Sequence, residues 1–533
     1  MPPESPSTLG AGVTLPTKPV YSVRVPEALR TVELGSSTGQ PAAAPASSLA
    51  TLAPGGPAAA GSWSERLLTC KRALDNPPYH NKWYAYKGLL NPYELVHVSS
   101  NRLRTHENVA GPLPLSRSYF KMWEMLHDFD LLDATVAAAA QPIRTAHFAE
   151  GPGGFIEAVA AWRERQEREG QEQRPTAGAD GGAHKPTATP SRTTASRTTG
   201  RSRDVYAGIT LRSTRRDVPG WGKSKRVLAR YPQIQLHYGQ DNTGNLYNVD
   251  NIVAFARSVG QGACALATGD GGIDYSVDFA QQEPLTFRLL LCQVYGGWLV
   301  LRRGGAFVCK LFDMYQPFTH DVLWLLAVTF DVVHLVKPHT SRPANSERYV
   351  VAKGFRGLPH RLSAFVQRVL RTWTDAGTPY PRLLATPPPT SFRRCLAEYN
   401  EWYAEQQCRN IRECLALIDG ERARADGGDG ESQQTEGRTP TSTAAVDAAR
   451  EGLHATTGDE SAYERLFQTR GTEPPSLSQR VLTRRFPERV HRQLCAARDW
   501  CAAYRVPLNP HNPQLRACLG GGGGNGGGGD RPD

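Results

Sequence analysis

The stretch HFAEGPGGFIEAVAAW, residues 147–162, combines a short apolar run, a glycine-rich turn and a helical pattern. Such a strand, turn and helix unit is the repeating element of α/β proteins. In an open α/β sheet, a ligand lies beyond the carboxyl ends of the strands, where glycines let the backbone approach it and a helix start offers free N–H groups. The Gly-Pro-Gly-Gly spacing at 151–154 differs from the G-x-G-x-x-G of a dinucleotide cradle, so a pyrophosphate is the weaker candidate. A plain turn without a ligand remains an alternative.

Short β-rich runs alternate with helical patterns on both sides of this turn, which is typical of a parallel sheet with helices on both faces. We therefore predict an α/β fold with a seven-stranded sheet. The expected strands begin at residues 144, 205, 233, 264, 306, 331 and 348, and the expected helices between them span 154–166, 279–301 and 318–330. After Gly357 no strand is expected, and helical patterns occupy 359–373, 392–418, 462–469 and 476–504.

Composition divides the chain into ordered and low-complexity segments. The first sixty residues hold ten prolines, and such segments bury too little apolar surface to offset their ordering entropy. The expected organisation is a disordered arm at 1–60, a main domain at 61–357 with a low-complexity insertion at about 167–203, a helical extension at 358–419, a disordered linker at 420–457, a helical segment at 458–518 and a glycine-rich tail at 519–533.

The charge balance favours a polyanionic partner. The chain carries 62 Lys and Arg against 51 Asp and Glu, so its formal charge is +11, and nucleic acid is the first candidate. Ten cysteines form no C-x-x-C pair, which predicts reduced, buried thiols, and no metal site is expected. Because the most apolar stretch, 322–336, is interrupted by Asp331 and His334, we expect a soluble, intracellular protein without a membrane association. Nucleus, cytoplasm and oligomeric state are not distinguished.

Two further strand ends carry a carboxylate. Asp241 follows the third strand in GQDNTGNLYN, where it could accept from an adenine amino group or a ribose hydroxyl. Asp270 follows the fourth strand in TGDGGIDYS, with two glycines that leave space beside it. The alternatives are an Asx-turn at Asp241 and an ordinary Asp-Gly turn at Asp270.

With these motifs the sequence resembles the FtsJ-type, S-adenosylmethionine-dependent RNA 2'-O-methyltransferases, and most closely their cap-methyltransferase branch, which includes versions from eukaryotes and large DNA viruses. The resemblance covers Ser116–Gly357. Its carriers, in the family's order, are SRSYFKMWE, AEGPGGFIEA, GQDNTGNLYN, TGDGGIDYS, GGAFVCKLFD and SRPANSERYVVAKGF. It implies a Rossmann-like methyltransferase fold, a seventh strand antiparallel to the rest beside strand five, and S-adenosyl-L-methionine as the cofactor.

The resemblance also implies the site residues. The catalytic tetrad corresponds to Lys121, Asp270, Lys310 and Glu347, and the cofactor pocket corresponds to Gly151, Pro152, Gly153, Gly154, Phe155, Asp241 and, at its edge, Asp270. One departure concerns the cofactor ribose. Compact ribosomal members have an acid at the end of the second strand, whereas here that strand ends in GITLR with Thr210 and no carboxylate.

The chemistry of methyl transfer explains why two lysines and two acids would be needed. The reaction is an in-line displacement in which a weakly acidic ribose hydroxyl must lose its proton, and Lys310, within the apolar run AFVCKLF, is the candidate that assists. Asp270 would orient Lys310, and Glu347 would fix Lys310 or Lys121. The alternatives are an edge-strand lysine reaching to solvent, a solvated Lys121 and a loop-capping Glu347.

A basic segment offers a candidate RNA surface. Residues 185–230 hold twelve Lys or Arg against two Asp, which would bind phosphates without reading sequence. The candidate residues are Arg215, Arg216, Trp221, Lys223 and Lys225, with Trp221 as a stacking platform for an unpaired base or a cap. The alternative is a solvated insertion.

Three functions follow from this sequence. The first is 2'-O-methylation of a cap-adjacent nucleotide of mRNA, with capped mRNA and the capping or transcription machinery as partners. The second is the same chemistry on ribosomal or other structured RNA. The third is a non-catalytic RNA- or cap-binding subunit on a methyltransferase fold, and a complete tetrad argues against it.

Overall fold

The structure of this protein is a computed structural model. It describes residues 15–16, 18–26, 30, 62–74, 76, 79–98, 100, 102–132, 141–172, 203–213, 220–272, 282–373, 382–426 and 484–515. The expected helix at 462–469, the tail at 519–533 and most of the expected insertion and linker lie outside these residues.

The strands form one mixed sheet in the order β1-β7-β8-β6-β5-β2-β3-β4. Their bounds are β1 Tyr21–Val23, β2 Arg144–Phe148, β3 Val205–Ile209, β4 Ile234–His237, β5 Cys264–Gly269, β6 Leu301–Leu311, β7 Phe330–Val336 and β8 Arg348–Phe355. Strands β2 to β6 pair in parallel with one another, whereas β8 lies antiparallel between β6 and β7. The α/β prediction and the implied antiparallel strand beside strand five are both confirmed.

An eighth strand was not expected. Tyr21–Val23 pairs antiparallel with the outer edge of β7, and Lys18, just before it, forms an ion pair with Glu124 at 3.0 Å. The prediction that residues 1–60 are entirely a disordered arm is therefore wrong for this segment. Strand β1 supplies backbone partners to an edge that would otherwise leave its N–H and C=O groups unpaired by the protein.

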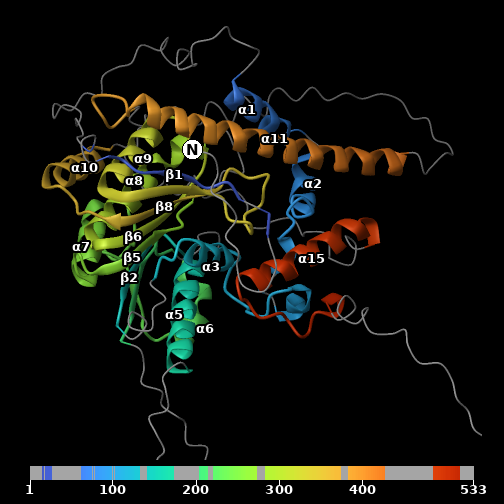
Figure 1. Cartoon of the computed structure of the whole chain (residues 1–533), viewed down its shortest axis with the longest axis horizontal. Helices are drawn as coiled ribbons and strands as arrows, with labels where there is room; N and C mark the ends of the chain where they lie inside the picture. Colours follow the sequence, from blue (N-terminus) through green and yellow to red (C-terminus); the bar gives the residue numbers. More distant parts are fainter. Residues whose placement is uncertain are drawn as a thin grey trace, which may run out of the picture.

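Helices cover both faces of the sheet (Figure 1). Their bounds are α1 Trp63–Leu74, α2 Tyr79–Tyr86, α3 Ser118–Asp128, α5 Gly154–Glu172, α6 Lys225–Arg230, α7 Val249–Val259, α8 Gln282–Val300, α9 Pro317–Thr329, α10 His360–Thr372, α11 Thr390–Asp426 and α15 Pro487–Ala503, with 3-10 turns η3 Glu94–Val96, η4 Arg102–Glu107 and η5 Trp221–Lys223. Helices α7 to α10 contribute to one hydrophobic cluster, and α3 and α5 contribute to another on the opposite face.

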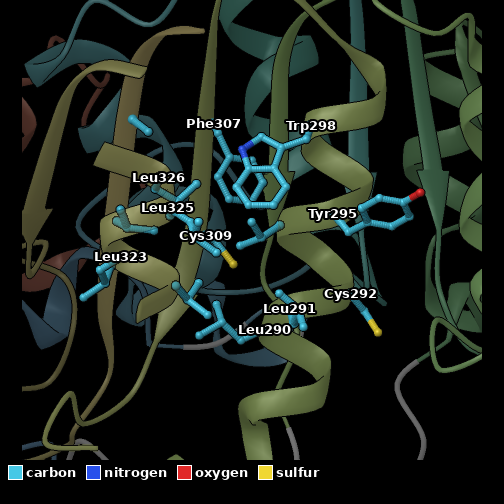
Figure 2. Packing of buried hydrophobic residues seen from close by; sticks show 14 of the residues in the cluster. Leu290, Leu291, Cys292, Tyr295, Trp298, Phe307, Cys309, Leu323, Leu325 and Leu326 are labelled. Carbon is cyan, nitrogen blue, oxygen red and sulfur yellow. The ribbon is translucent and has the colours of Figure 1, made fainter. Parts of the chain in front are cut away.

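Strand β6 shows how the sequence pattern produces this layering. Phe307 and Cys309 lie in the cluster with α8 and α9, whereas Ala306 and Val308 lie in the cluster with α3 and α5. Figure 2 shows Phe307 and Cys309 among the leucines of the two helices. The period-two alternation therefore divides the side chains of one strand between two cores.

Helix α8 comes close to the sheet because two of its residues lack a side chain. A Cβ atom at Gly296 would lie 2.4 Å from the Phe148 ring, and one at Gly297 would lie 2.7 Å from the Phe307 ring. Both distances are shorter than van der Waals contact allows. The pair Gly296-Gly297 thus sets the spacing between α8 and strands β2 and β6.

The C-terminal region is helical, as expected. In Figure 1, α11 runs along α1, with which it shares a third hydrophobic cluster. Tyr399 and Tyr403 are buried core residues of this helix. Two expected boundaries differ from the structure, because α11 continues to Asp426, beyond the linker start expected at 420, and α5 continues to Glu172, beyond the insertion start expected at about 167.

Among the helices that the structure describes, none combines the length and the apolar character needed to cross a bilayer.

Candidate active site

Four charged side chains from distant parts of the sequence meet at the carboxyl end of the central strands. Lys121 lies on α3, Asp270 directly follows β5, Lys310 lies near the end of β6, and Glu347 directly precedes β8. Strands β5 and β6 are parallel neighbours, so Asp270 and Lys310 reach the same edge. Because β8 is antiparallel to β6, its first residues lie beside the last residues of β6, with Tyr349 opposite Lys310.

Lys310 is paired with Asp270. The ammonium Nζ lies 3.3 Å from Asp270 Oδ1 and donates to the Asp270 carbonyl at 2.7 Å, while the Tyr349 hydroxyl donates to Asp270 Oδ1 at 3.1 Å. A Cβ atom at Gly272 would lie 3.1 Å from Lys310 Nζ, so the glycine leaves room for the ammonium. Strand β6 is interior, which excludes the alternative of an edge-strand lysine.

Lys121 is paired with Glu347. Nζ lies 2.6 Å from Oε1 and 2.8 Å from Oε2, and Ser341 Oγ donates to Oε1 at 2.8 Å. Of the two lysines that Glu347 was expected to fix, the structure selects Lys121. All four charged side chains are 13–16% exposed, so Lys121 is not the freely solvated lysine of the alternative interpretation.

The two pairs also influence each other. Burial alone would raise the pKa of Glu347, but Lys121, Lys310 and Lys337 outweigh it and hold this pKa at about 2. Burial alone would lower the pKa of Lys310, but the Asp270 and Glu347 carboxylates more than compensate, so this pKa lies above its ordinary value. Near neutral pH, therefore, Glu347 is ionised and Lys310 is a cation.

The Gly-Pro-Gly-Gly turn is shaped by its neighbours. The Gly151–Pro152 bond is cis, and Gly153 has a φ of +106°. A Cβ atom at Gly153 would lie 2.8 Å from the Trp221 indole, so both its φ and close packing favour glycine there. A Cβ atom at Gly154 would lie 2.1 Å from Ser118 Oγ, so this hydroxyl would have to move. Phe155 follows this turn but lies in the core. Its ring is fully buried, and the ring centroid lies 5.8 Å from that of Tyr349.

Glu150 is a candidate site residue that the sequence reasoning missed. It precedes the turn, is buried, and receives a hydrogen bond from Thr268 Oγ1. Its Oε2 atom lies 3.2 Å from His147 Nδ1 but accepts no hydrogen bond within the described part of the chain. Burial raises the pKa of this carboxyl. The available signal was an acid directly before the glycine turn, two residues after the end of β2.

Asp241 uses its carboxylate within its own loop. Oδ1 accepts from Thr243 N at 2.9 Å and Thr243 Oγ1 at 2.7 Å, and Oδ2 accepts from Asn248 Nδ2 at 2.7 Å. Slight burial would raise the pKa of Asp241, but these hydrogen bonds lower it below its ordinary value. The residue is exposed at the carboxyl edge of the sheet, in the Asx-turn geometry of the alternative interpretation.

Trp221 is not the exposed stacking platform that the sequence suggested. It is only 8% exposed, and its indole packs over Gly153 and Gly208, where added Cβ atoms would lie 2.8 Å away in both cases. The absence of side chains at the two glycines creates a slot that draws the indole into the core. Lys223 and Lys225 are exposed, as expected, whereas Arg215 and Arg216 lie outside the described residues.

Part of this chain is similar to a known protein family. Residues 114–355 match the model of the FtsJ-like methyltransferase family, which confirms the resemblance over the segment that carries the four charged residues. The matched segment contains the whole sheet except β1, together with the turn at 151–154.

Several curated relatives are cap methyltransferases by name. The chain is 30% identical over 298 residues to cap-specific mRNA (nucleoside-2'-O-)-methyltransferase 1 of Dictyostelium discoideum, covering 54% of this chain and 33% of the relative. It is 32% identical over 185 residues to the protein of that name from Trypanosoma cruzi, covering 34% and 51%. It is also 39% identical over 127 residues to inactive cap-specific mRNA (nucleoside-2'-O-)-methyltransferase 1B of Caenorhabditis briggsae, covering 23% and 15%. The matches thus span from about a seventh to a half of these relatives' lengths.

Proposed function

We propose that this protein is an S-adenosylmethionine-dependent RNA ribose 2'-O-methyltransferase that acts on the cap-adjacent nucleotide of mRNA. The observation that carries this proposal is the meeting of Lys121, Asp270, Lys310 and Glu347 as two ion pairs at the carboxyl end of β5 and β6. The family match and the names of the relatives support the reaction class and the substrate.

In this proposal each ion pair has its own role in the reaction. Bound S-adenosylmethionine would supply a methyl group on a positively charged sulfur. Lys310, oriented by Asp270, would receive the hydroxyl proton, and Lys121, held by Glu347, would place the ribose and its phosphate. The pKa of Lys310 is raised in this structure, so the Lys310 ammonium must lose a proton before it can accept one from the hydroxyl. The positively charged sulfur of bound S-adenosylmethionine would favour that loss, because a nearby like charge lowers the pKa of an ammonium.

The turn at 151–154 fits the cofactor. It lies at the carboxyl end of β2, and Glu150 beside it offers Oε2, an oxygen that accepts no hydrogen bond from the described residues. In this proposal Gly151, Pro152, Gly153 and Gly154 form the wall of the cofactor site, Asp270 lies at its edge, and Phe155 supports it from the core. Asp241 would contribute mainly by keeping its loop in shape, because both carboxylate oxygens accept hydrogen bonds from that loop.

Lys223 and Lys225 would contribute to RNA binding through phosphates. Because each phosphate contact that is lost reduces the salt dependence of binding, Lys223→Glu with Lys225→Glu is expected to lower the slope of log K against log salt by about 1 to 2. A slope equal to that of the unmodified protein would place the RNA elsewhere.

The decisive experiment is transfer of labelled methyl from S-adenosylmethionine to short capped and uncapped RNAs of one sequence. The labelled nucleotide is identified after digestion, and the Lys310→Ala variant serves as the catalytic control. Label on the ribose next to the cap, in capped RNA only, is the expected result. Label at internal positions without regard to the cap would support the ribosomal or structured-RNA alternative, and RNA binding without any label would support a non-catalytic subunit.

A further inference from the structure

Helix α11 lies outside the segment that matches the family, yet it contacts the chain just after β6 and at the start of β8. Asn400, Tyr403 and Gln407 are three and four residues apart and therefore share one face of the helix. Asn400 Nδ2 donates to the Met314 carbonyl, just beyond β6, at 2.5 Å. The ring of Tyr403 lies 4.8 Å from the guanidinium of Arg348, the first residue of β8.

Gln407 contacts the segment that leads into Glu347. Its side chain is buried, at 3% exposure, and Nε2 donates to the Ala344 carbonyl and to Ser346 Oγ, both at 3.2 Å. Ser346 Oγ in turn donates to Asp313 Oδ2 at 3.3 Å. Gln407 therefore holds the backbone at Ala344, three residues before Glu347, and the hydroxyl of Ser346, one residue before it.

The rest of this loop, residues 338–347, is held from other elements. Glu124 of α3 accepts from the backbone N–H groups of His339 at 2.7 Å and Thr340 at 2.8 Å. Lys337 at the end of β7 donates to the carbonyls of Asn345 at 3.0 Å and Glu347 at 2.7 Å. Gln407 thus adds a support on the side of the loop that faces α11.

We infer that Gln407 is a positioning residue, which fixes the Ala344–Ser346 backbone and thereby sets the carboxylate of Glu347 against Lys121. Its effect on turnover rests on the proposed function. Without the two hydrogen bonds from Gln407, the loop would move more freely, and the Lys121–Glu347 pair would occupy its competent geometry for less of the time.

The test is the substitution Gln407→Met, which keeps a similar volume but removes the donor. Gln406→Met is the matched control, because Gln406 is the adjacent residue of the same type, is partly exposed and accepts from Arg409 of the same helix at 3.3 Å. Amide hydrogen exchange of residues 338–347 is expected to become roughly tenfold faster in Gln407→Met and to remain unchanged in the control.

Kinetics on capped RNA give the second readout. In Gln407→Met, kcat is expected to fall about tenfold, while KM for RNA and for S-adenosylmethionine changes less than about twofold. A cavity of about 130 Å³ lies beside Gln407, lined by Trp83 and Asn345 among others. If Gln407 served only as a wall of this cavity for a bound substrate, KM would rise and exchange in 338–347 would stay the same, which would overturn the inference.

The two proposals can fail separately. Absence of methyl transfer by the unmodified protein would refute the proposed function, and hydrogen exchange would still decide whether Gln407 positions the loop. If Gln407→Met does not fold, Ser346→Ala removes one of the two acceptors, and exchange in 338–347 is then expected to rise about threefold. Exchange equal to that of the unmodified protein in the folded variant would refute the positioning role.

Discussion

Two regions of the candidate site are built in different ways: the acceptor side, where the proposed function places the ribose hydroxyl, and the cofactor side, where it places S-adenosylmethionine. On the acceptor side, Lys121 with Glu347 and Lys310 with Asp270 form two largely buried ion pairs. On the cofactor side, the turn at 151–154 is shaped by backbone conformation and by the packing of Trp221 and Ser118. Ion pairing therefore fixes the side-chain positions in the first region, whereas backbone conformation and close packing fix the shape of the second.

The largest effect is expected when Lys310 is replaced by Ala. Loss of the proposed proton acceptor should reduce kcat by roughly a thousandfold and leave the affinity for S-adenosylmethionine nearly unchanged. Single-turnover methyl transfer and calorimetric titration measure the two quantities. Arg361→Ala, which removes an exposed cation of α10 that belongs to neither the proposed active site nor the proposed RNA surface, is the control. Near-normal turnover of the Lys310→Ala variant would show that Lys310 is not the proton acceptor of the reaction.

Replacing Glu347 by Gln tests the second pair. Because the charge is lost but the shape is kept, kcat should fall about tenfold to a hundredfold and the free energy of unfolding should fall by roughly 3 kcal/mol near neutral pH. The pKa of Glu347 is depressed from 4.5 to about 2, so its contribution is full above pH 4.5 and is lost as pH falls toward 2.

Denaturant titrations of both proteins across this pH range measure the contribution. The stability difference between them should be constant above about pH 5 and should shrink below it. A difference that does not depend on pH would mean that the ionised Glu347 carboxylate does not stabilise the fold.

Gly153→Ala tests the region controlled by volume. Its Cβ would lie 2.8 Å from Trp221 at a φ of +106°, so we expect a loss of about 1 to 3 kcal/mol in unfolding free energy and weaker cofactor binding. Gly222→Ala is the matched control, because its added Cβ would have no atom within 4 Å. Equal stability of the two variants would show that packing does not shape the turn.

The smallest effect is expected for Asp241→Asn. Asparagine keeps the acceptor oxygen of the Asx-turn, so the affinity for S-adenosylmethionine should fall less than about threefold if the residue only shapes its loop. Isothermal titration of the cofactor measures this. A loss of more than about tenfold would instead show that the carboxylate contacts the cofactor, as the family resemblance implies.

Much of the fold could be predicted because its signals are local. Alternation along 306–311 divided the side chains of β6 between two faces, and glycine at 151, 153 and 154 marked the end of β2. Strand β1 was missed because three residues in a proline-rich arm carry little pattern of their own and depend on pairing with β7. Trp221 was misjudged because the slot that buries it is made by Gly153 and Gly208, which lie on other elements and meet Trp221 only in the folded chain.

By itself, the sequence determined the α/β class and the helical C-terminal region, because the periodicity of apolar residues encodes these features. The four charged residues were singled out by the resemblance to the FtsJ-type family. Tertiary structure alone decided which lysine pairs with which carboxylate, since Lys121 and Glu347 are 226 positions apart and meet only after β8 is inserted antiparallel beside β6. It also decided that Gln407 of α11 supports the loop that carries Glu347. Such contacts depend on how whole elements pack, and no short stretch of sequence records that packing.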